Sequence, residues 1–180
     1  ICTKYNMPLF NDGARLGYAL TATGNDVTLE DIARIADVFY IGGTKVGAMF
    51  GEAVVFTHGN MPKNFVTLVK QHGALLAKGW LLGVQFDTLF TDNLYCRIAR
   101  RANDAADRIR EVLVERGYTL TFDAPTNQIF ITLDNETSER LQRSVRLGFM
   151  EKADDTHTVM RICTSWATTD EQVEQLIALL

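Results

Sequence analysis

The stretch from Asp37 to Phe56, DVFYIGGTKVGAMFGEAVVF, constrains the fold of this chain most strongly. It holds two apolar segments typical of buried strands, joined by a glycine-rich turn that carries a single lysine, Lys45. Glycines without side chains permit positive φ, a sharp turn and the close approach of a flat ligand; here they are Gly42, Gly43, Gly47 and Gly51. We expect the amine of Lys45 to be desolvated between the two strands, which favours its uncharged, nucleophilic form. Lys45 is therefore the predicted catalytic residue.

Composition and charge exclude several classes of protein. The chain has 180 residues, of which 47% are hydrophobic and 22% charged, enough to bury a core as one domain or two small ones. A formal net charge of -4 provides no basic surface, so neither nucleic acid nor an anionic membrane is an expected partner. No segment reaches the roughly 18 apolar residues that a membrane helix needs, and no signal peptide is visible, so we expect a cytoplasmic protein.

The cysteines predict no disulfide framework. There are three of them, without CxxC spacing: Cys2, Cys96 and Cys163. An odd number of widely spaced cysteines indicates neither a disulfide scaffold nor a zinc site. We expect buried, reduced thiols and no metal in the site.

The first half of the chain alternates strands and helices. The chain starts, without methionine, on what resembles the last turn of a helix, so we expect it to begin inside a domain. A strand is predicted at residues 8–11, followed at its carboxyl end by the motif DGAR and a helix from Arg15 to Leu20. A helix up to Ala36 is predicted from Thr28 as its N-cap, with acidic residues in its first turn. Residues 61–91 are so apolar that one or two helices, broken near Gly73, should pack against another domain or subunit.

The second half reads as an α+β unit. An amphipathic pattern over residues 93–116 predicts a helix that ends at Gly117. Strands are expected at 118–122, 128–133, 147–150 and 158–163, and helices at 136–145 and 170–180. We place the boundary between the two halves near Asp92.

Three residues of the first half suggest a cofactor. Asp12 stands at a strand end, Arg15 three residues further on, and Lys45 in the glycine turn. A pyridoxal phosphate site uses such a set: a lysine carries the aldehyde, a carboxylate keeps the pyridine nitrogen protonated, and an arginine binds an anion. Each residue also has an ordinary alternative, as part of a turn, a surface cation or a lysine without function.

Four segments in one order resemble the threonine aldolase and β-eliminating lyase family, pyridoxal phosphate enzymes of the aspartate-aminotransferase-like fold. These segments, which together extend over essentially the whole chain, are PLFNDGARLGYAL, DVFYIGGTKVGAMFGEAVVF, KQHGALLAKGWLLGVQF and MRICTSWATTDEQVEQL. The resemblance implies an α/β fold and the C-terminal half of a longer enzyme. Residues 1–92 would be the C-terminal part of a large cofactor-binding domain with a mostly parallel sheet, and residues 93–180 a small α+β domain.

The resemblance also implies roles for single residues. Asp12 resembles the aspartate that pairs with the pyridine nitrogen, and Lys45 the lysine that forms the internal aldimine. Thr44 keeps a hydroxyl beside it, for the cofactor phosphate. Arg15, in DGAR, resembles the arginine that binds the substrate carboxylate, and Arg161, in MRICTSW, resembles a second such arginine from the small domain. The histidines match no catalytic histidine of the family and are expected at the surface or in an interface: His58, His72 and His157.

The implied activity is cleavage of the Cα–Cβ bond of a β-hydroxy amino acid, threonine or allo-threonine, to glycine and acetaldehyde. The implied assembly is a homodimer or homotetramer, since sites of this fold are built at a subunit interface. Two alternatives stay open. One is a non-catalytic fragment or pseudoenzyme that acts through oligomer contacts of residues 61–91. The other is a different enzyme that uses the same cofactor with Lys45 and Asp12: a β-eliminating lyase, a racemase or an aminotransferase.

Overall fold

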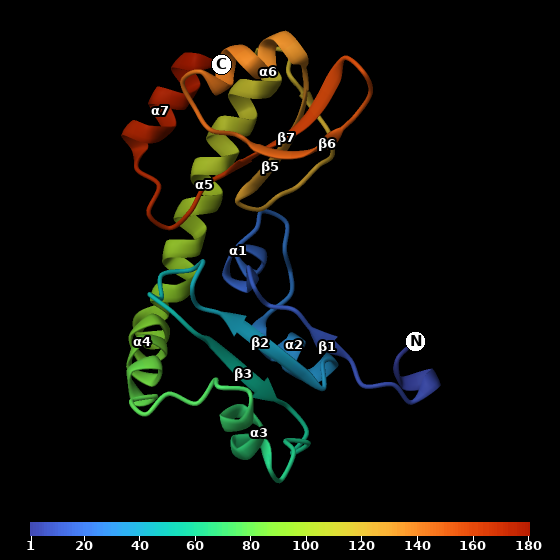
Figure 1. The fold of residues 1–180 in the computed structure, drawn as a ribbon, viewed down its shortest axis with the longest axis vertical. Helices are drawn as coiled ribbons and strands as arrows, with labels where there is room; N and C mark the ends of the chain where they lie inside the picture. Colours follow the sequence, from blue (N-terminus) through green and yellow to red (C-terminus); the bar gives the residue numbers. More distant parts are fainter. The chain divides into compact units, whose positions relative to one another are not determined.

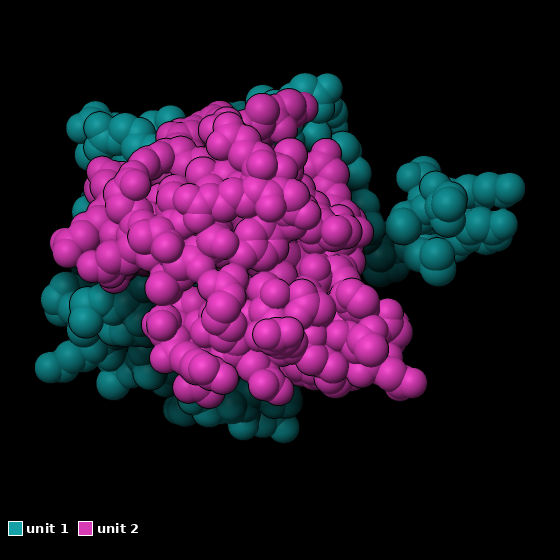
Figure 2. Space-filling model, turned by 90° about the horizontal axis from the view of Figure 1, so that it is seen from above, with its two compact units in different colours: residues 1–20, 25–97 teal, residues 21–24, 98–180 magenta.

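A computed structural model describes all 180 residues and divides them into two compact units, each with its own sheet. Unit 1 comprises residues 1–20 and 25–97, and unit 2 comprises residues 21–24 and 98–180; they are teal and magenta in Figure 2. The chain passes from unit 1 to unit 2 inside helix α5 (Leu94–Glu115), between Arg97 and Ile98, whereas the sequence placed the division near Asp92. No helix combines the length and the hydrophobicity needed to cross a membrane.

Unit 1 is built on a three-stranded sheet in the order β1 (Phe10–Asn11), β2 (Val38–Gly42) and β3 (Glu52–Phe56) (Figure 1). Strand β1 runs parallel to β2, with Asn11 opposite Phe39, and β2 runs antiparallel to β3. The sheet within this chain is therefore mixed, where the sequence predicted a mostly parallel one. The cause is the short link over residues 43–51, because a parallel neighbour needs a crossover of about a dozen residues or more.

Most helices of unit 1 begin and end close to the predicted positions: η1 (Thr3–Tyr5), α1 (Leu16–Leu20), α2 (Leu29–Ile35), α3 (Phe65–Gln71) and α4 (Trp80–Phe90). The short η2 (Thr91–Asn93) was not predicted. Helix α2 has the predicted cap, since the hydroxyl of Thr28 accepts from the N–H of Asp31 while the carboxylate of Asp31 accepts from the N–H of Thr28. The apolar stretch forms two helices, and Gly73 lies between them with a positive φ of 71°.

Many apolar side chains of this stretch are exposed within the chain. They belong to α3, α4 and the segments beside them: Met61, Val66, Leu75, Leu76, Trp80, Leu81, Val84 and Phe90. The core of unit 1 is made instead by side chains from α1, β2, the turn after it, α4 and the first turn of α5: Leu16, Tyr18, Phe39, Ile41, Val46, Ala48, Leu89 and Tyr95.

Unit 2 is an antiparallel sheet with helices, in the strand order β4 (Thr119–Leu120), β5 (Gln128–Asp134), β7 (His157–Cys163) and β6 (Gly148–Lys152). Alternate residues of β5 pack into one core with the apolar face of α5 and with α6 (Asn135–Gln142) and α7 (Asp170–Leu179). Figure 1 labels these elements. That core consists of Ala105, Ala106, Ile109, Leu113, Ile129, Ile131, Leu133, Leu141, Leu147, Met160, Ile162 and Val173.

The cysteines are all free thiols, and one of them corrects a prediction. Cys2 and Cys96 are partly buried, whereas Cys163 is exposed. The expectation of a buried thiol is wrong for Cys163 because it follows the buried Ile162 in β7, and successive side chains of a strand point to opposite faces.

Candidate active site

Asp12 lies just beyond the carboxyl end of β1, and one oxygen of its carboxylate accepts two hydrogen bonds. The backbone N–H of Ala14 donates to Oδ1 over 3.0 Å, and the hydroxyl of Tyr40 donates to the same oxygen. The hydrogen bond from Tyr40, followed by that from Ala14, holds the pKa of Asp12 below its ordinary value. The positive charges of Lys45 and Arg15 lower this pKa further. Asp12 is therefore ionised at neutral pH, and the charges of Lys45 and Arg15 act on it over distances longer than that of an ion pair.

The turn that carries Lys45 is fixed through its backbone. The hydroxyl of Tyr18, a buried residue of α1, donates to the carbonyl oxygen of Lys45. At the start of the turn, the carboxylate of Glu52 accepts from the N–H of Gly43 over 2.6 Å and from the hydroxyl of Thr44 over 3.1 Å. The turn is thus held by a helix on one side and by the first residue of β3 on the other.

The side chain of Lys45 is exposed, and its amine forms no hydrogen bond or ion pair with the rest of the chain. The expectation that the amine is desolvated between two strands is therefore wrong for this chain. The physical reason is the turn itself: Val46 and Ala48 point inward and are buried, which leaves Lys45 on the outer side. Its amine is accessible to a ligand.

The glycines of this turn serve two different purposes. Gly47 and Gly51 have the positive φ that the sequence predicted, 97° and 89°. Gly42 is needed for close packing instead, since a Cβ there would lie 2.5 Å from the carbonyl oxygen of Ala14. The backbone of the DGAR segment therefore packs directly against Gly42, the last residue of β2.

Tyr95 connects α1 with the end of β2 through its hydroxyl group. Its hydroxyl accepts from the N–H of Gly17 in α1 over 3.1 Å and donates to the carbonyl of Gly42 over 2.9 Å. Burial raises the pKa of Tyr95, so the hydroxyl keeps its proton. The sequence indicated only that α5 has an apolar face, and it gave no signal for this polar role.

The two arginines of the prediction lie in different units. Arg15 precedes α1, is partly buried, and its guanidinium makes no hydrogen bond within the chain. Arg161 lies in β7 of unit 2, where its Nη1 donates to Oε1 of Gln128 over 3.2 Å and its buried Nε has no partner. Both arginines keep donors that a carboxylate can use.

Unit 1 thus brings together Asp12, Arg15, Thr44 and Lys45, and Arg161 belongs to unit 2. Four residues that the sequence did not single out hold this group: Tyr18, Tyr40, Glu52 and Tyr95. A signal existed for Tyr40. If the strand before Asp12 pairs in parallel with the strand that contains Tyr40, the carboxyl ends of both strands lie at one edge of the sheet, and Tyr40 comes close to Asp12.

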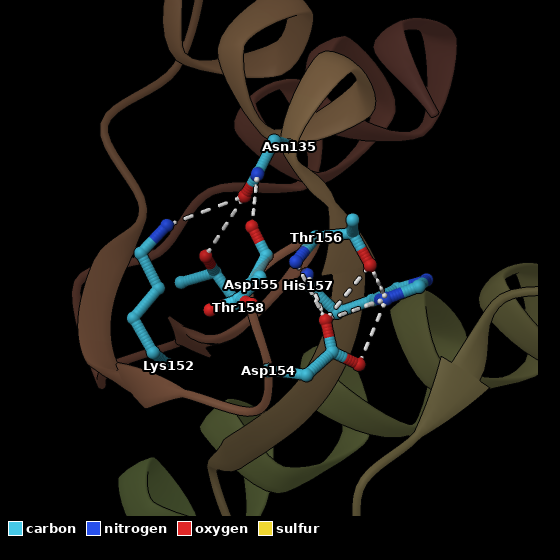
Figure 3. A network of polar contacts seen from close by, with 7 residues as sticks. All are labelled: Asn135, Lys152, Asp154, Asp155, Thr156, His157 and Thr158. Carbon is cyan, nitrogen blue, oxygen red and sulfur yellow. Dashed lines mark hydrogen bonds and ion pairs between the residues drawn. The ribbon is translucent and has the colours of Figure 1, made fainter.

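His157 takes part in the turn between β6 and β7, shown in Figure 3. Asp154 Oδ1 accepts from the backbone N–H groups of Thr156 and His157, each over 2.7 Å, and His157 Nδ1 lies 3.1 Å from both carboxylate oxygens. These hydrogen bonds, led by those from Thr156, hold the pKa of Asp154 well below its ordinary range. Asn135 closes the network by donating to the carbonyl of Asp155 and accepting from Lys152. His157 is therefore engaged in turn structure, while His58 and His72 are exposed.

A cavity of about 550 Å³ lies beside this turn in unit 2 and contains none of the predicted site residues. Its lining includes Arg116, Tyr118, Thr132, Asp134, Asp154 and His157.

The chain is similar to known threonine aldolases, although no protein-family model matches it. A low specificity L-threonine aldolase of Pseudomonas aeruginosa is 28% identical over 176 residues, which cover 97% of this chain and 50% of that protein. The solved threonine aldolase of Leishmania major is 40% identical, with a TM-score of 0.95, and the match covers 99% of this chain and 52% of the other. The chain therefore spans about half the length of the curated relatives it matches.

A more distant structure shares the fold. Serine palmitoyltransferase from S. paucimobilis, solved with a bound pyridoxal phosphate–myriocin aldimine, has a TM-score of 0.64 at 12% identity, over 99% of this chain and 47% of the other. The α/β fold class predicted from the sequence, that of pyridoxal phosphate-dependent transferases, is confirmed. The resemblance first seen in the sequence is confirmed as well: over nearly its whole length, this chain is similar in sequence and in structure to about half of a threonine aldolase.

Proposed function

We propose that this chain supplies the lysine, the aspartate and two carboxylate-binding arginines of a pyridoxal phosphate-dependent lyase. The proposed reaction breaks the Cα–Cβ bond of threonine or allo-threonine and releases glycine and acetaldehyde. The observation that carries the proposal is the packing of the segment with Asp12 and Arg15 against the start of the turn that holds Lys45. There the N–H of Gly42 donates to the carbonyl of Gly13 over 2.9 Å, and a Cβ on Gly42 would lie 2.5 Å from the carbonyl oxygen of Ala14. The identity of 40% with a threonine aldolase over 99% of the chain supports the same reaction.

The residues present fit the chemical groups of pyridoxal phosphate. Its aldehyde needs an accessible amine, and the amine of Lys45 is exposed and forms no hydrogen bond or ion pair with the rest of the chain. Its pyridine nitrogen needs an anion, and Asp12 has a free oxygen, Oδ2, because both hydrogen bonds from the chain go to Oδ1. Thr44 lies next to Lys45, and its hydroxyl, which donates to Glu52 over 3.1 Å in this chain, would have to turn from Glu52 to the phosphate. We therefore assign Asp12, Thr44 and Lys45 to cofactor binding.

Each residue has a separate task in the reaction. Bound pyridoxal phosphate would supply an electron sink for the bond that breaks at Cα. Asp12, with its lowered pKa, would stay ionised and keep the proton on the pyridine nitrogen. Arg15 and Arg161 would bind the substrate carboxylate through charge-assisted hydrogen bonds. Because the position of the carboxylate decides which Cα bond is aligned for cleavage, the arginines would set reaction specificity as well as affinity.

Product analysis tests the reaction. The protein is incubated with pyridoxal phosphate and either threonine or serine, and acetaldehyde, glycine, ammonia and keto acid are measured. Acetaldehyde and glycine from threonine are the expected products. Ammonia and a keto acid from serine, without acetaldehyde from threonine, would replace the proposal by a β-eliminating lyase that uses the same lysine and aspartate.

The exposed apolar side chains of residues 61–90 favour a homo-oligomer, and we include a homodimer or homotetramer in the proposal. They are also the observation behind a second candidate function, a non-catalytic protein that acts through oligomer contacts. Sedimentation together with the product assay separates the two, because an oligomer that forms neither product set supports the non-catalytic function. The cytoplasmic location stays a prediction from the sequence.

A further inference from the structure

Tyr40 lies in β2 beside the strand end that carries Asp12. Strands β1 and β2 run parallel, with Asn11 opposite Phe39. The residues that follow these two, Asp12 and Tyr40, therefore lie side by side. The Tyr40 hydroxyl donates a hydrogen bond to Oδ1 of Asp12. The ring of Tyr40 lies against Phe10, with 6.1 Å between ring centroids, which limits the positions that the hydroxyl can take.

The two hydrogen bonds to Asp12 share one oxygen. Tyr40 and the N–H of Ala14 both donate to Oδ1, and Oδ2 receives no hydrogen bond from the chain. A carboxylate with two donors on one oxygen has its plane and its direction fixed. The remaining oxygen is therefore free to accept from a ligand N–H at a defined position.

The backbone around this carboxylate is fixed too. The N–H of Gly42 donates to the carbonyl of Gly13 over 2.9 Å, and a Cβ on Gly13 would lie only 1.6 Å from the carbonyl oxygen of Tyr40. Tyr40 therefore contacts the Asp12-Gly13 segment through both its backbone and its side chain.

We propose that Tyr40 is a positioning residue, which turns Oδ2 of Asp12 toward the cofactor's pyridine nitrogen; the identity of that cofactor rests on the proposed function. The hydrogen bond also distributes the negative charge of Asp12, since it lowers the pKa of the carboxyl group and raises the pKa of the Tyr40 hydroxyl. The positive charges of Lys45 and Arg15 also lower the pKa of this carboxyl group. Tyr40 differs from them because its hydrogen bond orients the carboxylate as well.

The variant Tyr40→Phe tests the proposal, because phenylalanine keeps the ring against Phe10 and removes only the hydroxyl. Tyr5→Phe is the matched control, since Tyr5 is 62% exposed and its hydroxyl bonds nothing in the chain. The first readout needs no cofactor. It is the NMR titration of the carboxyl carbon of Asp12, assigned by comparison with Asp12→Ala. We expect the midpoint to rise in Tyr40→Phe and to stay unchanged in Tyr5→Phe.

The second readout is the dissociation constant of pyridoxal phosphate, from absorbance titration of the whole chain. A lost hydrogen bond to a positioned carboxylate corresponds to about 3- to 10-fold weaker binding in Tyr40→Phe. In the Asp12→Ala background the same change should have no effect, because the acceptor is gone. A structural effect of Tyr40 alone would instead persist in that background.

Three results overturn the proposal or part of it. An Asp12 midpoint that is equal in Tyr40→Phe and the parent protein would remove the role of Tyr40 and leave the proposed function intact. Equal loss of cofactor affinity with and without Asp12 would make Tyr40 a packing residue. Failure of the parent protein to bind pyridoxal phosphate would overturn the proposed function, and with it the ligand assigned to Oδ2.

Discussion

The hydroxyl of Tyr18 donates a hydrogen bond to the backbone carbonyl of Lys45. Tyr18 belongs to α1 and is 1% exposed, whereas the side chain of Lys45 is exposed. A buried residue near the DGAR motif thus fixes the backbone of the turn and leaves the amine free. Helix α1, which follows the DGAR motif, is therefore in direct contact with the turn of Lys45 within unit 1.

The change Tyr18→Phe should lower the free energy of unfolding by about 1 kcal/mol, because it removes a hydrogen bond to a backbone carbonyl and keeps the ring. Urea unfolding of the variant and of the parent protein measures this difference. Tyr5→Phe serves as the control and should unfold at the same urea concentration as the parent. An unchanged midpoint for Tyr18→Phe would show that the hydrogen bond adds nothing to stability.

The change Gly13→Ala should destabilise unit 1 by about 3 kcal/mol or more, since its Cβ would lie 1.6 Å from the carbonyl of Tyr40 and the backbone would have to move. The control is Gly83→Ala in α4, where a Cβ meets no atom within 4 Å. That change should stabilise the helix by about 0.5–1 kcal/mol. Thermal unfolding measures both, and similar shifts for the two variants would contradict the close approach at Gly13.

Acid should loosen the turn between β6 and β7. The pKa of Asp154 is lowered in the folded protein from an ordinary value of 3.8, chiefly by hydrogen bonds from Thr156. The carboxylate therefore stabilises the turn above pH 3.8, and this contribution is lost as the pH falls below that value through the lower folded pKa. The protection factors of the Thr156 and His157 amides, which are corrected for the intrinsic pH dependence of exchange, should fall over this range in the parent protein. In Asp154→Asn the protection factors should depend less on pH, and an equal dependence would contradict the assignment.

The change Arg161→Lys should raise the KM for threonine about tenfold, because lysine keeps the charge and loses the planar pair of donors that a carboxylate accepts. The exposed Arg143→Lys, outside the proposed site, is the control and should leave KM unchanged. Initial rates of acetaldehyde release measure both. An unchanged KM in Arg161→Lys would remove Arg161 from the substrate site.

Much of the fold was predictable because its signals are local. The cap at Thr28, the amphipathic pattern of α5 and the strand pattern of β5 lie within single elements, and each appears at the predicted position. The mixed sheet of unit 1 and the exposed Cys163 were predicted less well. Both depend on which strands pair and on which face of a strand a residue falls, and neither is decided by neighbouring residues alone.

The residue types of the candidate site were also visible in the sequence, but their supports were not. Tyr40 is 28 residues from Asp12, and Tyr18 is 27 residues from Lys45, so these contacts exist only once β1, α1 and β2 have packed. The exposure of Lys45 has the same origin. Its apolar neighbours suggested burial, yet the geometry of the turn sends Val46 inward and Lys45 outward.

Covalent labelling shows directly whether Lys45 is the residue that binds pyridoxal phosphate. The protein is mixed with pyridoxal phosphate and reduced with borohydride, and its peptides are analysed by mass spectrometry, with Lys45→Ala as the control. We predict a phosphopyridoxyl group on Lys45 at substoichiometric cofactor, with little on other exposed lysines such as Lys63 and Lys78. An unlabelled Lys45, or a label spread equally over all exposed lysines, would contradict it.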